Sequence, residues 1–221
     1  GPRLLNNFHK GVMSSGCNVV DIGEVPTPLL YFSTFKTNIS DGVMLTGSHN
    51  PKNYNGLKIV INKRSMTSEK IKKIKSMIEE ESFMDGSGKL TSLDIKDDYL
   101  KELQEKIKIN SKMKVCLDCG NGVGGVIAPH AFKLLGLDVI ELYSEVNGNF
   151  PNHHPDPSDP KNLKDLQKKV LETNSDLGIA LDGDGDRVGL IDNKGNIIFP
   201  DAYMMLLAED LLRKKSKGSI V

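Results

Sequence analysis

Residues 114–143 read KVCLDCGNGVGGVIAPHAFKLLGLDVIELY, and this stretch decides the fold. A strand pattern at 114–118 leads into a glycine-rich loop, a helical pattern over 126–135 and a second strand over 138–143. The alternation continues with a helix over 161–173, a strand over 177–182, and a hairpin of 187–192 with 196–199. Strands that alternate with helices predict an α/β fold, in which helices cover both faces of a mainly parallel sheet.

The chain before residue 110 shows the same mixture of short strands and amphipathic helices. The predicted elements are a helix through Leu4 and Val12, a strand at 18–22, a helix capped by Thr27 with Pro28 in its first turn, strands at 42–46 and 56–61, and helices over 67–82 and 99–107. The stretch Asn110-Ser111-Lys112 is typical of a linker between domains.

We therefore expect two three-layer α/β/α domains with mixed, mainly parallel sheets, one over 1–109 and one over 110–199. Residues 200–221 predict the start of a third domain, with a helix over 201–217 and a strand beginning at 218–221. Both chain ends are typical of a piece cut from a longer protein.

Composition excludes several classes of function. Lys+Arg and Asp+Glu both number 29, so net charge gives no reason to expect nucleic acid or a membrane as a partner. No apolar run approaches the ~20 residues of a membrane span, and no secretory signal is visible. An odd count of three cysteines argues against a disulfide framework and for a reducing, cytoplasmic location. Cys116 and Cys119 form a CxxC pattern, but residues three apart in a strand point to opposite faces, so we expect two core cysteines.

Three carboxylates occupy alternate positions of one loop, Asp182-Gly183-Asp184-Gly185-Asp186. Side chains spaced by two point to one side of an extended loop, so the carboxylates are expected to converge on one ion. Oxygen ligands favour Mg²⁺ or Ca²⁺ over zinc. An EF-hand is excluded because its sixth position would be Arg187 rather than Gly, and its twelfth Asn193 rather than Glu. A bare acidic turn is disfavoured because three close carboxylates repel one another.

Ser48 lies between Gly47 and His49, on the loop that leaves an apolar strand. Taken alone, it fits an ordinary turn hydroxyl. His49 is adjacent and carries an imidazole, a common proton-transfer group, and Lys58 follows one strand later, where it can fold back over the same cleft. A Ser-His hydrolase is not supported, because the loop lacks the Gly-x-Ser-x-Gly spacing. Ser48 and the Asp loop both follow strands, and ligands of α/β sheets gather at strand ends, so one shared cleft is expected.

The loop Gly120-Asn121-Gly122-Val123-Gly124-Gly125 formally satisfies the dinucleotide fingerprint GxGxxG, with Glu141 at the end of the next strand. We favour a closely packed strand-to-helix turn, because Pro129 falls near the helix start and a dinucleotide site leaves the Asp loop unexplained. The loop Asn152-His153-His154-Pro155-Asp156-Pro157 is rigid and carries two imidazoles, which do not complete a zinc site. A structural role and a place in the cleft are both open for it.

Together these segments resemble the α-D-phosphohexomutase family, in its phosphomannomutase/phosphoglucomutase branch. The matching pieces are Val25–Pro28, Thr46–Pro51 with Tyr54–Ile59, Asp118–Gly122, Phe150–Pro157 and Asp182–Arg187. They occur in the family's order over nearly the whole chain, and the serine and Asp-loop motifs are highly specific. Gly47 favours this branch over the phosphoglucosamine mutases, which usually carry Ala there.

The resemblance implies a phosphoserine at Ser48 whose phosphate, with Asp182, Asp184 and Asp186, coordinates one Mg²⁺ per active site. Ser48 would exchange this phosphate with mannose or glucose 1- or 6-phosphate through a 1,6-bisphosphate, a glucose 1,6-bisphosphate-type intermediate and activator. The metal and Arg187 would offset charge on the transferring group. His49 and Lys58 are the candidates for proton transfer.

Family motifs that precede and follow these segments are absent from the 221 residues, including the loops that read the sugar and grip the distal phosphate. We therefore expect this chain alone to have negligible mutase activity, and to be a monomer or a weak dimer formed through an exposed sheet edge. A phosphoglucosamine mutase of the same family, a dinucleotide-binding oxidoreductase and a non-catalytic metal- or sugar-phosphate-binding module remain as alternatives.

Overall fold

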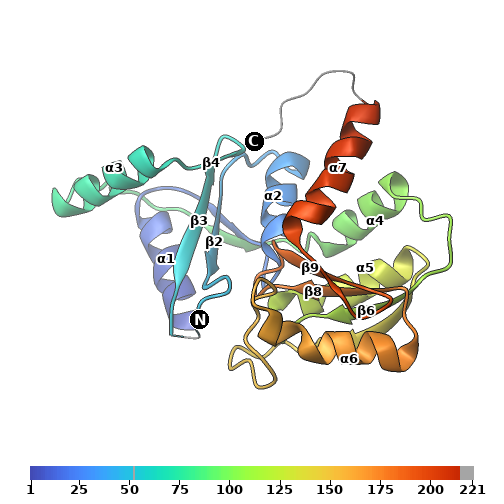
Figure 1. Ribbon diagram of the computed structural model, residues 1–221. Coiled ribbons are helices and arrows are strands. Elements are labelled where there is room, and N and C mark those ends of the chain that lie inside the picture. Colours follow the sequence, from blue (N-terminus) through green and yellow to red (C-terminus); the bar gives the residue numbers. More distant parts are fainter. Residues whose placement is uncertain (52, 215–221) are drawn as a thin grey trace. The chain divides into compact units, whose positions relative to one another are not determined.

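The computed structural model describes residues 1–51 and 53–214, and the chain divides into two compact units (Figure 1). The first unit is Gly1–Lys106, and the second begins at Ile107. Within the predicted third segment the structure describes one helix, α7 (Pro200–Lys214). The strand predicted at 218–221 and the last residues of the predicted helix lie outside the described residues.

The first unit contains four helices and five short strands among its described residues. In chain order these are α1 (Pro2–Ser14), β1 (Val19–Asp21), α2 (Thr27–Lys36), β2 (Gly42–Thr46), β3 (Gly56–Ile61), β4 (Arg64–Ser65), α3 (Ser68–Glu79), β5 (Leu90–Ser92) and α4 (Lys96–Lys106). Strands β2, β3 and β4 form an antiparallel sheet, and β1 pairs with β5 in parallel. The short strands β4 and β5 have exposed residues throughout, so they carry no burial pattern from which to predict them.

The hairpin of β2 and β3 fixes the position of the Ser48 loop. Its register pairs Thr46 with Gly56 and Met44 with Lys58, so the loop closes the end of the hairpin. Helix α2 packs on β2. The prediction that Thr27 caps this helix is wrong, because the cap is Pro26 and Thr27 is already the first helical residue; Pro28 lies in the first turn as predicted.

The second unit is built on one five-stranded sheet with the order β10-β9-β8-β6-β7. Its elements are β6 (Lys114–Asp118), the 3₁₀ helix η1 (Val123–Val126), α5 (Ala128–Leu134), β7 (Asp138–Leu142), the 3₁₀ helix η2 (Pro160–Leu163), α6 (Lys164–Thr173), β8 (Leu177–Leu181), β9 (Val188–Asp192), β10 (Ile197–Ile198) and α7.

This sheet has a helix layer on each face. Helix α6 packs on β6, β8 and β9, and the core on that side contains Cys116, Leu166 and Val170. The core on the other side contains Leu117 and Cys119 together with the partly buried residues of α5 (Figure 1). Cys116 and Cys119 are both fully buried on opposite faces, which confirms two core cysteines.

The sheets are mixed, as expected, but the expectation that parallel pairing predominates is wrong. Among the described strand pairs three are parallel, β1–β5, β6–β7 and β6–β8, and four are antiparallel. The reason is connection length. The links from β8 to β9, from β9 to β10, from β2 to β3 and from β3 to β4 are too short for the crossover that a parallel pair requires.

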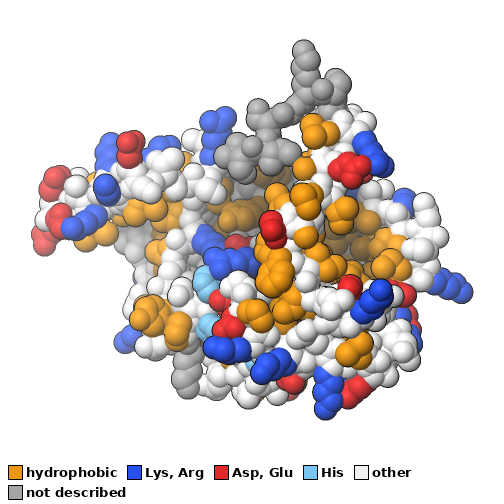
Figure 2. Space-filling view, in the orientation of Figure 1, with side chains coloured by type: hydrophobic (Ala, Val, Ile, Leu, Met, Phe, Trp, Pro, Cys, Tyr) orange, Lys and Arg blue, Asp and Glu red, His pale blue; other side chains and the backbone are white. Residues whose placement is uncertain are grey.

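Helix α7 leaves its hydrophobic residues largely uncovered, and none of its residues is buried. Hydrophobic side chains accordingly gather along it in Figure 2. Those that are at least half exposed are Met205, Leu206, Leu207, Leu211 and Leu212. Across residues 1–51 and 53–214, no helix has both the length and the apolar character that a membrane crossing requires.

Candidate functional site

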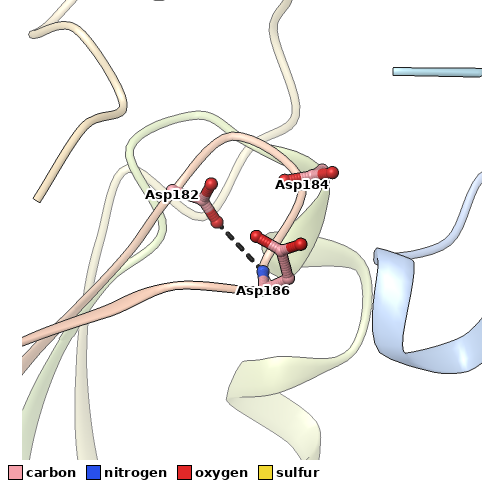
Figure 3. Close-up of side chains that lie close together, drawn as sticks. All are labelled: Asp182, Asp184 and Asp186. Atoms are coloured by element: carbon pink, nitrogen blue, oxygen red, sulfur yellow. Dashed lines mark hydrogen bonds between the residues drawn. The ribbon is translucent and has the colours of Figure 1, made fainter. Parts of the chain in front are cut away.

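The loop between β8 and β9 brings its three carboxylates together. Asp182, Asp184 and Asp186 each offer an oxygen, and these oxygens all lie within 4.8 Å of one another (Figure 3). Asp182 and Asp184 are buried, whereas Asp186 is exposed. The predicted convergence of the three side chains is therefore confirmed, with the exposed member giving an approach from solvent.

Backbone hydrogen bonds fix Asp182 at the base of this loop. Its Oδ1 accepts the N–H groups of Asp186 and Arg187, each at 3.0 Å, and its own N–H donates to the Arg187 carbonyl at 3.2 Å. The pKa of Asp182 is raised to about 6, because burial and the charges of Asp184 and Asp186 together outweigh the hydrogen bonds from Arg187 and Asp186, which lower it. Three converging carboxylates thus raise the free energy of the loop unless a cation offsets their charge.

The donor set fits Mg²⁺. This ion prefers oxygen ligands at about 2.0–2.1 Å in an octahedral arrangement, in which neighbouring ligands lie about 2.9 Å apart. The oxygens of the triad lie within 4.8 Å of one another, so their side chains would have to move closer together to bind one ion. No sulfur or imidazole belongs to the cluster, which argues against zinc.

The Ser48 loop holds its serine in an uncommon backbone conformation. Ser48 has a φ of 51°, in the left-handed region that non-glycine residues rarely adopt. Its N–H donates to Thr46 Oγ1 at 2.8 Å, and the N–H of Asn50 donates to the Gly47 carbonyl at 2.9 Å. A Cβ at Gly47 would lie 2.9 Å from the Tyr54 carbonyl oxygen, so this turn requires glycine.

The two predicted proton-transfer residues lie in the same unit as Ser48. His49 Nδ1 lies 3.4 Å from Ser48 Oγ, a weak contact whose direction depends on the tautomer. Lys58 pairs with Met44 in the hairpin and is partly buried. Because paired residues share a face, Lys58 lies on the sheet face that also carries Thr46.

Arg187 lies at the end of the Asp loop and is exposed. With Asp186 it lines one part of a cavity of about 330 Å³ in the second unit. The other lining residues are mostly apolar and come from the segments 157–163, 188–189 and 197–203. The prediction that Ser48 and the Asp loop share one cleft stays a prediction.

The glycine-rich loop packs closely against neighbouring backbone, which agrees with the closely packed turn that we favoured over a dinucleotide site. A Cβ at Gly122 would lie 2.8 Å from the Gly183 carbonyl oxygen, and a Cβ at Gly125 would overlap the Ser144 carbonyl oxygen. In a dinucleotide site such glycines let the backbone approach a pyrophosphate. Here protein backbone occupies that space.

Sequence reasoning missed the pair of Asp118 and His153. Asp118 Oδ2 lies 2.9 Å from His153 Nε2, although the two residues belong to motifs far apart in the sequence. Both motifs had been singled out, but no spacing rule connects them. The sequence likewise gives no sign that Thr46 Oγ1 accepts the hydrogen bond of the Ser48 N–H, because threonine is common at strand ends.

Two models of protein families match the chain. Residues 1–85 match "Phosphoglucomutase/phosphomannomutase, alpha/beta/alpha domain I", and residues 97–195 match domain II of the same description.

Known proteins give a consistent result. A Pseudomonas aeruginosa protein named phosphomannomutase/phosphoglucomutase is 48% identical over the whole chain, which covers 48% of that protein. A phosphoglucomutase of Neisseria meningitidis serogroup B is 42% identical over the whole chain, again covering 48% of its length. The crystal structure of a phosphoglucomutase/phosphomannomutase family protein from Burkholderia thailandensis superposes with a TM-score of 0.94 at 39% identity, covering 97% of this chain and 48% of that one. The chain thus spans about half the length of the curated relatives it matches.

Proposed function

The chain belongs to the phosphoglucomutase/phosphomannomutase family, in its first two α/β/α domains, and we propose that it carries the phosphoryl-transfer residues of a phosphohexomutase. The reaction is the reversible transfer of a phosphoryl group between the 1- and 6-positions of mannose or glucose phosphate. The observation that carries the proposal is the convergence of Asp182, Asp184 and Asp186, because a divalent cation can offset the charge of a transferring phosphoryl group and this loop offers a fitting set of ligands.

Ser48 is proposed as the phosphate carrier. The phosphorus–oxygen bond at Ser48 Oγ breaks as a bond forms to a hydroxyl oxygen of the sugar phosphate, giving a hexose 1,6-bisphosphate. After the sugar turns around, Ser48 Oγ attacks the other phosphate and the serine ester forms again. The left-handed conformation of Ser48 supports this role, since strained backbone is found most often where a side chain must be presented.

The Asp triad would hold Mg²⁺ together with the Ser48 phosphate. Bound there, the ion would draw charge from the transferring phosphoryl group. The guanidinium of Arg187, at the end of the same loop, would stabilise the remaining negative charge.

The sugar hydroxyl must lose a proton as its oxygen bonds to phosphorus. Ser48 Oγ, the leaving oxygen, must gain a proton in the same step. His49, whose Nδ1 lies 3.4 Å from Ser48 Oγ, would supply that proton and be restored by the one that the sugar releases. The Lys58 ammonium shares the sheet face of Thr46 and would serve the reverse transfer or hold the phosphate.

A phosphoglucosamine mutase is the main alternative within the family. The close approach of Gly47 to the Tyr54 carbonyl oxygen favours the phosphomannomutase/phosphoglucomutase branch, since an alanine would contact that oxygen at 2.9 Å. A reducing, cytoplasmic location is consistent with three free cysteines.

Intact mass after incubation with glucose 1,6-bisphosphate tests the proposal. We expect an adduct of about 80 Da, the mass of one phosphoryl group, that maps to Ser48. Ser48→Ala should abolish the adduct, whereas Ser40→Ala, which removes a hydroxyl that hydrogen-bonds Asp41 elsewhere in the unit, should retain it. An adduct that persists in Ser48→Ala would overturn the assignment. A metal-binding module without catalysis predicts Mg²⁺ binding and no adduct.

Mutase activity is proposed for the longer protein to which such domains belong, and the 221-residue chain alone should turn over negligibly. An assay of the chain with mannose 1-phosphate and glucose 1-phosphate checks this. Robust turnover of either sugar would contradict it.

A further inference from the structure

The peptide groups that flank Gly183, between the first two carboxylates of the Asp loop, are held from two directions. The Gly183 N–H donates to the Pro155 carbonyl at 3.2 Å. The Gly183 carbonyl accepts the N–H of Val123 at 3.0 Å. Pro155 belongs to the loop Asn152–Pro157, here called the histidine loop, and Val123 belongs to the glycine-rich loop. Two separate loops therefore set the path of the Asp loop.

The glycine-rich loop packs directly against the backbone of Gly183. A Cβ at Gly122 would lie within 2.9 Å of both the carbonyl oxygen and the Cα of Gly183. Asn121 also fixes this loop, because its side-chain amide donates to the Glu145 carbonyl and accepts a hydrogen bond from the Asn152 side chain. Any shift of this loop therefore moves the backbone that carries Asp182 and Asp184.

Asp118 and His153 join the two loops. Asp118 is fully buried at the end of β6. Its Oδ1 accepts the Gly120 N–H at 2.8 Å, and its Oδ2 faces His153 Nε2 at 2.9 Å. His153 in turn lies two residues before Pro155. One buried carboxylate thus contacts both loops that hold Gly183.

The protonation state of His153 follows from its neighbours. Its Nδ1 faces the His154 carbonyl oxygen at 3.0 Å, and its Nε2 faces the Asp118 carboxylate. A carbonyl and a carboxylate only accept hydrogen bonds, so both ring nitrogens must carry a proton. Burial lowers the pKa of His153, but the hydrogen bond and charge of Asp118, the hydrogen bond to His154 and the charge of Asp165 together raise it by more, which agrees with an imidazolium.

We propose that the Asp118–His153 ion pair is a positioning device that locks the two loops around Gly183 and thereby sets the affinity of the Asp triad for a divalent cation. This inference rests on the proposed function only in requiring that the triad binds a metal. Neither residue belongs to the triad, so both act through the backbone. As long as Asp118 and His153 stay paired, the three carboxylates of the Asp triad keep their spacing.

The sign of the effect separates positioning from simple electrostatics. A positive ring that acted by its charge alone would repel a cation, so its removal would strengthen binding. A positioning role predicts the opposite, since a loosened loop must be reordered when the ion binds. Partners that orient metal ligands typically change affinity by about 10–100-fold when they are replaced.

Mn²⁺ titration of the 221-residue chain, followed by electron paramagnetic resonance of the free ion, tests the proposal. His153→Gln and Asp118→Asn keep side-chain volume while breaking the ion pair, and each should weaken Mn²⁺ binding about 10-fold. The double variant should be no weaker than either single one, because the two residues act as a unit. His154→Ala removes the neighbouring, exposed imidazole and should bind as the unaltered chain does.

Two further measurements keep the outcomes distinct. In the metal-free variants hydrogen exchange at the Gly183 amide should accelerate while the amide of Gly178 in β8 keeps its protection, since a pair that only stabilises the unit would change both. Asp182→Asn should lose Mn²⁺ in any case. If the unaltered chain binds Mn²⁺ no better than Asp182→Asn does, the metal proposal fails. If the unaltered chain binds Mn²⁺ better than Asp182→Asn, but both pair variants bind it as well as the unaltered chain or better, only the positioning inference fails. Should His153→Gln not fold, His153→Asn, which also removes the positive ring, takes its place, because Asp118→Asn removes a negative charge and would weaken cation binding by electrostatics alone.

Discussion

At the scale of the residue, burial decides which reactive groups can act. Ser48 is partly exposed on a loop and holds a left-handed backbone, whereas Cys116 and Cys119 are sealed within the two core layers of the second unit. Cys17 is the exposed thiol of the three. The CxxC spacing therefore reflects packing, whereas the Ser48 hydroxyl is accessible for the chemistry proposed for it.

Thiol labelling provides a prediction at this scale. Burial raises the pKa of Cys119 to about 12, and only the thiolate reacts readily, so Cys119 should resist modification at pH 8. Cys116, fully buried, should resist as well. We expect dithionitrobenzoate to modify one thiol per native chain and three in denaturant. Cys17→Ser should reduce the native count to zero, and a residual fast thiol in that variant would contradict the prediction.

At the scale of the element, loops that follow strands carry the candidate chemistry, and their shapes depend on other loops. The Asp loop joins β8 to β9, yet its path is set by the loops after β6 and β7. The hairpin of β2 and β3 does the same for Ser48 by bringing Thr46 and Gly56 together. Close backbone approaches make glycine obligatory at a few of these positions.

Gly122→Ala tests the contact between the glycine-rich loop and the Asp loop. The added methyl would meet only backbone atoms, those of Gly183 and the carbonyl oxygen of Cys119, which cannot rotate away. Overpacking of this kind costs about 1–3 kcal/mol, so we expect the free energy of unfolding of the second unit to fall by that amount. Mg²⁺ binding should weaken as well.

Gly148→Ala is the matched control, because no atom lies within 4 Å of the Cβ it would add. Its unfolding free energy should stay within about 0.5 kcal/mol of that of the unaltered chain. Chemical denaturation of both variants followed by circular dichroism measures the difference. Equal stability of the two variants would show that the Gly183 contact is looser than described.

At the scale of the whole molecule, the chain consists of two compact units, and each contains buried hydrophobic residues. The candidate metal ligands from the protein all lie in the second unit, and Ser48 lies in the first. Chains with several units commonly unfold in more than one step, so a ligand that binds one unit reveals which transition belongs to it.

Calorimetry with and without Mg²⁺ therefore provides a prediction for the unphosphorylated chain. After removal of metal with EDTA we expect two unfolding transitions. Mg²⁺ at about 100 times its dissociation constant should stabilise one unit by about 2.7 kcal/mol and raise only that transition. Asp182→Asn should abolish the shift, whereas Asp138→Asn, which alters an exposed carboxylate of the same unit, should preserve it. An unchanged shift in Asp182→Asn would contradict the assignment of the metal loop.

The sequence by itself determined most of the elements, though not the short strands β4 and β5, together with the α/β class and the loops that carry the candidate chemistry. Alternating patterns located β6, β7 and β8 within a residue of their ends, because burial of one or both faces leaves a periodic trace in hydrophobicity. Carboxylates spaced by two, and a serine between glycine and histidine, were visible because their spacing is local. The same motifs supported the family to which the chain belongs.

Only the tertiary structure decided which distant groups meet. Asp118 and His153 are 35 positions apart and form one ion pair; Gly122 and Gly183 are farther apart and touch through their backbones. Antiparallel pairing outnumbered parallel pairing because connection length, rather than strand composition, sets direction. The physical reason is common to all three: periodicity and propensity act over a few residues, whereas sheet order and loop contacts are fixed only when the chain closes on itself and each buried polar group must find its partner.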